Sequence, residues 1–202
     1  MVLVDIGNTN FHIYRNGEIT DLKSIPSFNE KVYYISVNEE KEAMLLKKNK
    51  NAINLKNYVK FPTEYEGLGI DRIMACMSVK NGVVVDAGSA VTIDVMEEGI
   101  HKGGIITPGI YAFKKSFATI SKVLEFDIEK IDLNKLPLNT QTALNYGSIG
   151  AIVSLIERVG KNKKIYLTGG DGGFLLDFIK NATFVEDLVF RGMIKTIKDM
   201  KK

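Results

Sequence analysis

The chain carries one short pattern twice, and this repeat limits its possible folds more than any other feature. Residues 2–8 and residues 83–89 each contain three apolar residues, an Asp, a small or apolar residue, a Gly and a polar residue. A segment of alternating apolar residues follows each copy, as expected of a second strand. The repeat predicts two similarly folded halves that face each other across a cleft. Because Asp5 and Asp86 each follow a buried strand, the cleft is predicted to hold a metal-bound polyphosphate.

The composition is typical of an ordinary soluble globular protein. Of the 202 residues, 45% are hydrophobic and 25% are charged. The net charge of +3 is too small to indicate a nucleic-acid partner, and the short lysine-rich runs are interpreted as solvated faces. The sequence contains no Trp and its other aromatic residues are scattered, so it offers no platform for base stacking.

Cysteine content and hydropathy restrict the compartment. The single cysteine, Cys76, excludes an internal disulfide and a zinc site built from cysteines. It lies in an apolar run, which favours a small buried side chain. No apolar stretch approaches the roughly 18 residues of a membrane span, and the N-terminus shows no signal-peptide pattern. We therefore expect a cytoplasmic protein that makes no membrane contact.

Turn and periodicity signals predict an α/β protein with mixed sheets flanked by helices. Asn16-Gly17 is a strong hairpin signal. A boundary near residue 80 divides the chain into an N-terminal domain of residues 1–80 and a C-terminal domain of residues 81–202. Besides the strands of the second copy, strands are expected at residues 2–6, 11–14, 19–22, 31–37, 52–55 and 164–167, and helices at residues 38–50, 71–80, 110–118, 140–158 and 188–198.

The sequence lacks both common glycine-rich phosphate loops. Neither Gly-x4-Gly-Lys-Ser/Thr nor Gly-x-Gly-x-x-Gly follows the repeated strands. The two Asp-x-Gly turns therefore remain as the candidate phosphate site, with Asp5 and Asp86 in metal-organising roles. Phosphoryl transfer also needs a carboxylate that accepts the proton of the attacking hydroxyl. Asp71, which directly follows a glycine loop, is the candidate for that role.

Each candidate also has a purely structural interpretation. Asp5 and Asp86 can cap their own turns through the backbone. Asp71 can be no more than the N-cap of the helix that follows it, since Asp is favoured there. Three further alternatives stay open: Arg72 as part of a surface ion pair, His12 and His101 as structural strand residues, and Gly169-Gly170 as a helix-entry turn.

Five motifs, taken in chain order, resemble those of the type III pantothenate kinases. The first motif, Asp-x-Gly-Asn-Thr, is shared across the wider actin, hexokinase and Hsp70 superfamily (ASKHA), whereas the ordered set of five is much more specific. The resemblance extends to about Gly192. The motifs are residues 5–10, 69–72, 86–92 and 103–109, and Asn139-Thr140 with Ala143 and Gly147.

The resemblance implies two actin-like (ribonuclease H-like) domains with ATP in the cleft between them. The implied reaction is ATP-dependent phosphorylation of the primary alcohol of pantothenate to 4′-phosphopantothenate, the first step of coenzyme A biosynthesis. Mg²⁺ is implied with ATP. Family members are homodimers in which the partner subunit completes the pantothenate pocket.

The resemblance also implies a role for individual residues. Asp71 is implied to be the proton acceptor. Asp86 is implied to hold the monovalent cation that the family requires, K⁺ or NH₄⁺. The implied ATP-binding residues are Asp5, Ile6, Gly7, Asn8, Thr9, Asn10, Phe11, His12 and Ser89, and the implied pantothenate-binding residues are Tyr65, Gly69, Ile70, Asp71, Arg72 and Thr140.

The sequence departs from the family pattern at a few positions. Val91 stands where the family usually has a Thr, so one hydroxyl is missing, and Ile70 replaces a common Ala in the substrate loop. Tyr65 lies upstream of that loop at a spacing that does not match the family, and the chain is short. Two other functions therefore stay open. One is a non-catalytic regulator like the Baf proteins, and the other is a phosphatase or a kinase for another small alcohol on the same fold.

Overall fold

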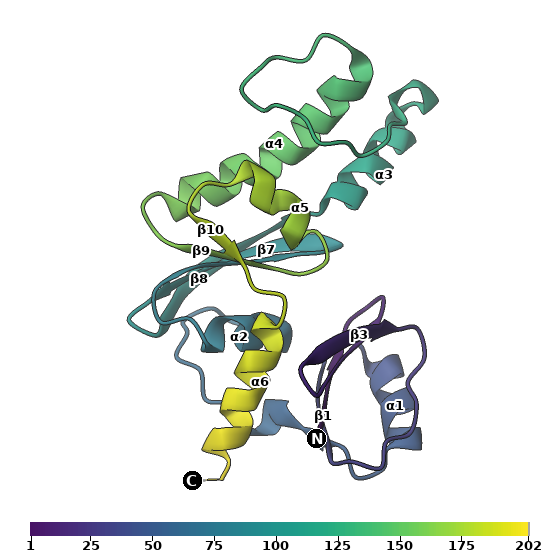
Figure 1. The fold of residues 1–202 in the computed structure, drawn as a ribbon, viewed down its shortest axis with the longest axis vertical. Helices are drawn as coiled ribbons and strands as arrows, with labels where there is room; N and C mark the ends of the chain where they lie inside the picture. Colours follow the sequence, from purple (N-terminus) through teal and green to yellow (C-terminus); the bar gives the residue numbers. More distant parts are fainter. Residues whose placement is uncertain (202) are drawn as a thin grey trace. The chain divides into compact units, whose positions relative to one another are not determined.

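The computed structural model describes residues 1–201 and contains two five-stranded mixed sheets (Figure 1). The strand order is β3-β2-β1-β4-β5 in the first sheet and β10-β9-β6-β7-β8 in the second. Read from opposite edges, the two sheets have the same order of strands along the chain. The repeated sequence pattern therefore corresponds to a repeated sheet topology, in which the first strand of each copy, β1 or β6, is the central strand. The expected α/β architecture with mixed sheets is confirmed.

The first sheet contains an antiparallel and a parallel part. β1 (Val2–Ile6) pairs antiparallel with β2 (Phe11–Arg15), which pairs antiparallel with β3 (Glu18–Leu22). On its other side, β1 pairs parallel with β4 (Val32–Ser36), which pairs parallel with β5 (Ile53–Asn54). This pairing leaves the carboxyl end of β1 directly before the turn that leads to β2.

Helices cover both faces of the first sheet. Leu45 of α1 (Glu39–Lys48) is fully buried among apolar side chains of β1, β2 and β4. On the opposite face, the ring of Tyr14 stacks on Phe190 of α6 (Leu188–Asp199), with ring centroids 5.3 Å apart. The central strand β1 is consequently buried on both sides, which explains why its residues are almost all apolar.

Local capping signals define two of these elements. At the start of α1, the Asn38 side chain accepts a hydrogen bond of 2.9 Å from the backbone N–H of Lys41. Acidic residues occupy its first turn and basic residues its last, in agreement with the helix dipole. Asn16 and Gly17, at the hairpin turn between β2 and β3, both have positive φ angles, of 54° and 92°, as the predicted two-residue turn requires.

The C-terminal helix packs against the helix that carries Asp71. α2 (Ile70–Met77) and α6 approach so closely that a Cβ atom on Gly192 would lie 2.0 Å from the backbone carbonyl oxygen of Met74. Only glycine fits between the two helix backbones at this point. The C-terminal segment therefore belongs with the first sheet, although it lies far from that sheet in the sequence.

The second sheet is built on the same plan. β6 (Gly82–Ala87) pairs antiparallel with β7 (Ala90–Glu97) and parallel with β9 (Ile165–Thr168). β9 pairs parallel with β10 (Ala182–Phe184), and β8 (Ile100–Pro108) lies beside β7. As in the first sheet, the central strand ends at an Asp-x-Gly turn.

Three α-helices accompany this sheet. They are α3 (Ile110–Ile120), α4 (Thr140–Gly160) and the single turn α5 (Gly172–Leu175). Figure 1 shows α4 running along the sheet beside α3. Buried residues of α4 form one core with residues of β6 and β7; those from α4 are Ile149, Ile152, Val153 and Ile156. Short 3₁₀ turns complete the described secondary structure at Leu55–Tyr58 (η1), Lys122–Leu124 (η2) and Leu176–Phe178 (η3).

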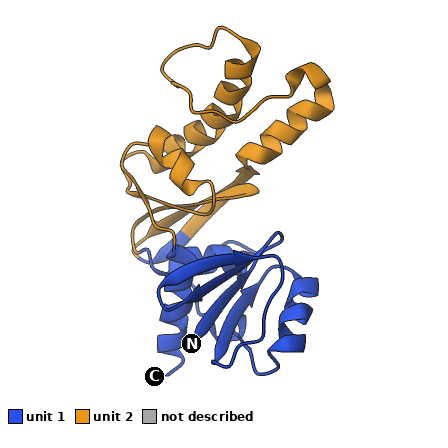
Figure 2. Cartoon of the chain, turned by 45° about the vertical axis from the view of Figure 1, so that its right-hand side comes forward, with its two compact units in different colours: residues 1–79, 99–101, 187–202 blue, residues 80–98, 102–186 orange. Residues whose placement is uncertain are grey.

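The chain divides into two units, shown in different colours in Figure 2. Unit 1 comprises Met1–Val79, Gly99–His101 and Asp187–Lys202, and unit 2 comprises Lys80–Glu98 and Lys102–Glu186. A single C-terminal domain of residues 81–202 is predicted from the sequence. The structure instead groups the C-terminal segment with unit 1, because α6 packs on α2 and on the first sheet. Among residues 1–201, no helix combines the length and hydropathy that crossing a membrane requires.

Candidate active site

The first Asp-x-Gly turn lies in unit 1, between β1 and β2. Asp5 is the penultimate residue of β1 and is half-buried. The backbone N–H of Gly7 donates to the carbonyl oxygen of Asn10 at 3.1 Å, which closes the turn and leaves Asn8 and Thr9 exposed at its tip. The start of α1 is nearby, since the Asn38 side chain donates to Asn8 Oδ1 at 3.5 Å. The turn thus presents polar side chains and backbone close to a helix N-terminus, a location that favours anions.

The second turn, in unit 2, is one residue shorter than the first. Ile6 pairs with Phe11 across the first turn, whereas Ala87 pairs with Val91 across the second. The N–H of Gly88 accordingly donates to the carbonyl oxygen of Ala90, at 3.0 Å. The sequence repeat therefore ends at the turn, and residues beyond it are not offset by the same amount in the two copies.

The shorter turn explains the departure at Val91. Its side chain is fully buried in the core of unit 2, so a hydroxyl at this position would not face the turn. Thr92 is the residue directly opposite Asp86 in the strand pair, and directly paired residues lie on the same face of a sheet. The Thr92 hydroxyl therefore shares the Asp86 face, and Ser89 is exposed at the tip of the turn.

Two glycine positions hold other segments of unit 2 against the second turn. Gly169 has a φ angle of 81°, and a Cβ atom there would lie 2.4 Å from Asp86 Oδ1. A Cβ atom on Gly109 would lie 2.0 Å from the Gly88 carbonyl oxygen, and the Gly109 N–H donates to the Ser89 carbonyl oxygen at 3.1 Å. Because Gly109 is the N-cap of α3, this helix begins directly at the Ser89 turn.

The glycine-rich segment after β9 has a defined place at this turn. The backbone N–H of Asp171 donates to the Ala87 carbonyl oxygen at 2.9 Å, and burial raises the pKa of the Asp171 carboxyl above its usual value. The sequence alone leaves Gly169-Gly170 open as a simple helix-entry turn. Its contact with Asp86 shows that it also forms one wall of the second turn, and the run of closely spaced glycines is the only sequence signal for it.

Asp71 lies in the first turn of α2 and is not the N-cap of that helix. The N-cap is Gly69, which makes no side-chain cap, so the interpretation of Asp71 as an N-cap is wrong. Asp71 Oδ1 accepts the backbone N–H of Arg72 at 2.8 Å, and a Cβ atom on Gly69 would lie 2.5 Å from this same oxygen. The half-buried carboxylate thus folds back over Gly69, which explains why a glycine precedes it.

Arg72 and Tyr65 lie against each other although they are seven positions apart in the sequence. The Arg72 side chain is 5% exposed, and its Cζ lies 4.7 Å from the centre of the Tyr65 ring. Arg72 is therefore buried, and its interpretation as part of a surface ion pair is wrong. The geometry is that of a cation–π contact, in which the ring face attracts the guanidinium.

The loop that carries Tyr65 is anchored by a distant histidine. His101 is buried and its Nδ1 lies 2.7 Å from Thr63 Oγ1, while the Tyr65 N–H donates to the same oxygen at 3.0 Å. The His101 N–H also donates to the Pro62 carbonyl oxygen at 3.0 Å. The structural interpretation of His101 fits these contacts. Sequence reasoning missed its partnership with Tyr65 because the two residues belong to different segments of unit 1.

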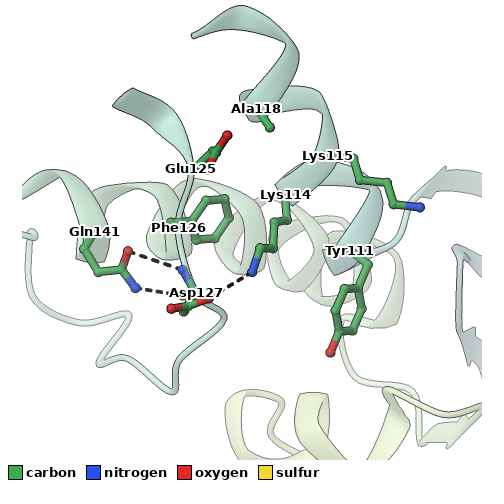
Figure 3. A pocket seen from close by; sticks show the side chains of 8 residues that line it. All are labelled: Tyr111, Lys114, Lys115, Ala118, Glu125, Phe126, Asp127 and Gln141. Carbon is green, nitrogen blue, oxygen red and sulfur yellow. Dashed lines mark hydrogen bonds and ion pairs between the residues drawn. The ribbon is translucent and has the colours of Figure 1, made fainter. Parts of the chain in front are cut away.

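The last predicted residue, Thr140, is exposed at the first position of α4. The neighbouring Gln141 lines a pocket of about 480 Å³ in unit 2, shown in Figure 3. Lys114 Nζ and Asp127 Oδ1 form an ion pair of 3.1 Å in this pocket. Its other lining residues are Tyr111, Lys115, Ala118, Glu125 and Phe126.

The predicted site residues divide between the two units. Residues 5–12, Tyr65 and residues 69–72 belong to unit 1, and Asp86, Ser89 and Thr140 belong to unit 2. The expected ATP cleft between the two halves stays a prediction. Within residues 1–201, no group of three His, Cys, Asp or Glu side chains is placed to hold a metal ion.

Comparisons with known proteins agree on one family. The family model described as "Type III pantothenate kinase" matches residues 25–162. The chain is 45% identical over 208 residues to the type III pantothenate kinase of Wolinella succinogenes, with 100% of this chain and 99% of that protein covered. The chain therefore matches its relative over the full length, including both units.

Solved structures extend the comparison to the fold. A Campylobacter jejuni protein, described as a conserved, proposed Baf family transcriptional activator, superposes with a TM-score of 0.89 at 43% identity, over 100% of this chain and 99% of that one. A proposed N-acetylglucosamine kinase from Porphyromonas gingivalis superposes with a TM-score of 0.52 at 8% identity over 100% of both chains. The second likeness concerns the fold alone and agrees with the actin-like fold expected from the sequence.

Proposed function

The chain belongs to the type III pantothenate kinase family, and we propose that Asp71 accepts the hydroxyl proton in its reaction. This reaction is the ATP-dependent phosphorylation of pantothenate to 4′-phosphopantothenate, the first step of coenzyme A biosynthesis. The observation that carries the assignment is the position of the Asp71 carboxylate, folded back over Gly69 and followed by the buried, stacked Arg72. A cytoplasmic location is part of the same proposal.

In the proposed step, the primary hydroxyl oxygen of pantothenate attacks the γ-phosphorus of ATP. The bond from the γ-phosphorus to the bridging oxygen breaks and ADP leaves, while the hydroxyl proton passes to the Asp71 carboxylate. The protein takes little part in covalent chemistry, because phosphoryl transfer depends mainly on the positioning of the reactants and on charge stabilisation. A positioned general base contributes about 10²- to 10⁴-fold to such a rate.

Phosphate binding is assigned to the two Asp-x-Gly turns. In the first copy the assigned residues are 5–12, with Asn8 and Thr9 exposed at the tip of the turn. In the second copy Ser89 is assigned. Its carbonyl oxygen accepts a hydrogen bond from the N–H of Gly109, the N-cap of α3. Helix N-termini favour phosphate because their backbone N–H groups and dipole point at the anion.

A kinase of this family uses ATP with a divalent metal ion. Mg²⁺ is usually held by one or two carboxylates together with substrate phosphates and waters. Asp5 would supply the carboxylate. When bound, the ion neutralises charge that develops on the phosphates.

We further assign the monovalent cation, K⁺ or NH₄⁺, to Asp86. The oxygen atoms around this carboxylate support the assignment, because hard cations prefer oxygen ligands. The Thr92 hydroxyl lies on the same face of the sheet, and Gly169 approaches the carboxylate without a side chain. Thermal stability measured in K⁺, NH₄⁺ and Na⁺ should distinguish specific binding from a general salt effect.

Pantothenate binding is assigned to the loop of Tyr65, to residues 69–72 and to Thr140. Pantothenate carries a carboxylate, and a guanidinium is the residue group best suited to recognise one. The contact of Arg72 with Tyr65 supports this role because it holds the guanidinium beside the ring of the same loop. Ile70 replaces a common Ala of the family and is buried, so its larger side chain points away from solvent.

We propose that the enzyme is a homodimer joined through unit 2. Large apolar side chains are exposed in the segment from the second half of β8 to the start of α4, and Leu138 is 98% exposed. Apolar surface of this kind marks interaction sites in soluble proteins. The exposed apolar residues of this segment, here called the α3 surface, are Ile106, Tyr111, Ile120, Val123, Leu136 and Leu138.

The decisive experiment measures ADP release in a coupled assay, with each of a panel of alcohols as the phosphoryl acceptor. We expect ATP consumption only when pantothenate is present, with strong dependence on K⁺ or NH₄⁺. ATP consumption without an acceptor would identify an ATPase, and a preference for another alcohol would identify a different small-alcohol kinase. Phosphate release from phosphorylated substrates would identify a phosphatase.

A regulatory function is the second candidate, supported by the name of the Campylobacter jejuni relative. It predicts no pantothenate-dependent turnover and binding to DNA. The small net charge of +3 disfavours that outcome, because sequence-independent DNA binding relies on many cationic contacts. An electrophoretic shift assay at physiological salt, performed beside the kinase assay, separates the two functions.

A further inference from the structure

A carboxylate that lies outside the five motifs contacts His12, a residue close to the first Asp-x-Gly turn. Asp21, on β3, lies with its Oδ1 2.6 Å from Nδ1 of His12 on β2. The strand register pairs His12 directly with Asp21 on one side and with Asp5 on the other. Directly paired residues point to the same face of a sheet, so the three side chains form a row across β1, β2 and β3.

The second nitrogen of the His12 ring faces the turn itself. A Cβ atom on Gly7 would lie 3.6 Å from His12 Nε2, which places this nitrogen in van der Waals range of the turn's glycine. Nδ1 and Nε2 are on opposite sides of the imidazole ring. The ring therefore spans the space between Asp21 and the Gly7 turn, with one nitrogen toward each.

From this geometry we infer that Asp21 is a positioning residue for ATP, acting through His12. The inference rests on the proposed ATP site at residues 5–12. An ionised carboxylate only accepts hydrogen bonds, so Nδ1 carries the hydrogen that Asp21 receives. This bond fixes the ring plane and aims Nε2 at the turn. The ring held in this way borders the turn at which the ATP phosphates are proposed to bind, so its orientation shapes that site.

The chain offers a matched control for this pair on the same strand. Glu18, like Asp21, is an exposed carboxylate of β3, but its register partner is Arg15 and not His12. Replacing Glu18 with Gln removes the same charge from the same strand and leaves the His12 contact intact. A difference between the two substitutions therefore reports the His12 contact and not the net charge of the strand.

The test measures ATP affinity by calorimetry without pantothenate, together with the KM values of both substrates. We expect H12A to weaken ATP binding at least ~10-fold and D21A to weaken it about 3- to 10-fold, since Asp21 acts indirectly and both side chains are partly exposed. D21N should lose less, because its amide oxygen still accepts the Nδ1 hydrogen. The KM of pantothenate should stay unchanged, and so should the ATP affinity of E18Q.

The double variant H12A/D21A gives the sharpest outcome. If Asp21 acts through His12, this variant binds ATP no more weakly than H12A alone, because coupled residues are not additive. Additive losses, or equal effects of D21A and E18Q, would overturn the inference, as would absence of ATP binding to the unmodified protein. An ATP-binding protein that does not phosphorylate pantothenate would instead refute the proposed function, while the comparison of variants would still decide the role of Asp21.

Discussion

At the scale of single residues, the position of the Asp71 carboxylate depends on Gly69. We expect Asp71→Asn to lower kcat by about 10²- to 10⁴-fold, because the amide keeps the shape but cannot accept the hydroxyl proton. ATP affinity should change little. Steady-state kinetics and calorimetry check both statements. Glu66→Gln, an exposed charge on the same loop, is the control. Near-normal turnover of the Asp71 variant would disprove the assignment.

Gly69 provides a second prediction about the same carboxylate. A methyl group at Gly69 would meet Asp71 Oδ1 at 2.5 Å, and the carboxylate would have to move. We expect Gly69→Ala to lower kcat by about 10- to 100-fold, since small displacements of catalytic groups are costly. The melting temperature should hardly change because the displaced atom ends a flexible side chain. In the Asp71→Asn background, Gly69→Ala should have no further effect on kcat; a full additional loss would mean that it acts elsewhere.

The sequence is most informative about residues whose role is encoded locally. Asp5, Asp86 and the glycines that follow them end their strands as predicted, because apolar runs and Asp-x-Gly turns are local signals. Tyr65 illustrates the limit of such reasoning. Its spacing fails to match the family, yet its ring lies on Arg72, because His101 anchors its loop from another part of the chain. No pattern in the loop itself records that contact.

The packing of α2 on α6 leads to a prediction at the scale of elements. Gly192→Ala places a methyl group 2.0 Å from a backbone oxygen of α2, so the helices must separate. Overpacking of this kind costs about 1–3 kcal/mol or more, and about 2–4 °C in melting temperature for each kcal/mol in a chain of this size. Calorimetric unfolding measures the loss.

Gly147→Ala in α4 is the control for this prediction. Apart from its chain neighbours and the backbone of its own helix, no described atom lies within 4 Å of the added methyl group, and Ala has the higher helix propensity. We expect it to be neutral or to stabilise the protein by up to ~1 kcal/mol. Equal destabilisation by both substitutions would show that the α2–α6 contact is not responsible.

Element boundaries depend on tertiary contacts more than element types do. The strands and helices predicted from periodicity occur, but α2 ends at Met77 and not at Lys80. The turn after β6 is one residue shorter than that after β1, although the two sequences align without a gap up to the turn. Turn length is set by strand register, and register follows from which side chains the core accepts. Val91 enters the core, and this choice shortens the turn.

At the scale of the whole molecule, the α3 surface predicts the assembly state. We expect the unmodified enzyme to sediment as a dimer, and Val123→Glu with Leu138→Glu to shift it to monomers, because buried unpaired charges oppose association. Pantothenate turnover should fall with the dimer fraction. Met44→Glu, at an exposed apolar position of α1, should leave the dimer intact. A monomeric unmodified protein would refute the proposal.

The division of the chain also determines when each unit can be completed during synthesis. N-terminal domains generally fold first as a chain emerges from the ribosome. Here unit 1 includes α6, so it stays incomplete until residue 199 has emerged, whereas unit 2 is complete once Glu186 has emerged. The helix that bears Asp71 therefore gains its packing partner last. A nascent chain released early would carry both Asp-x-Gly turns, but the helix that bears the proposed base, Asp71, would lack its packing partner α6.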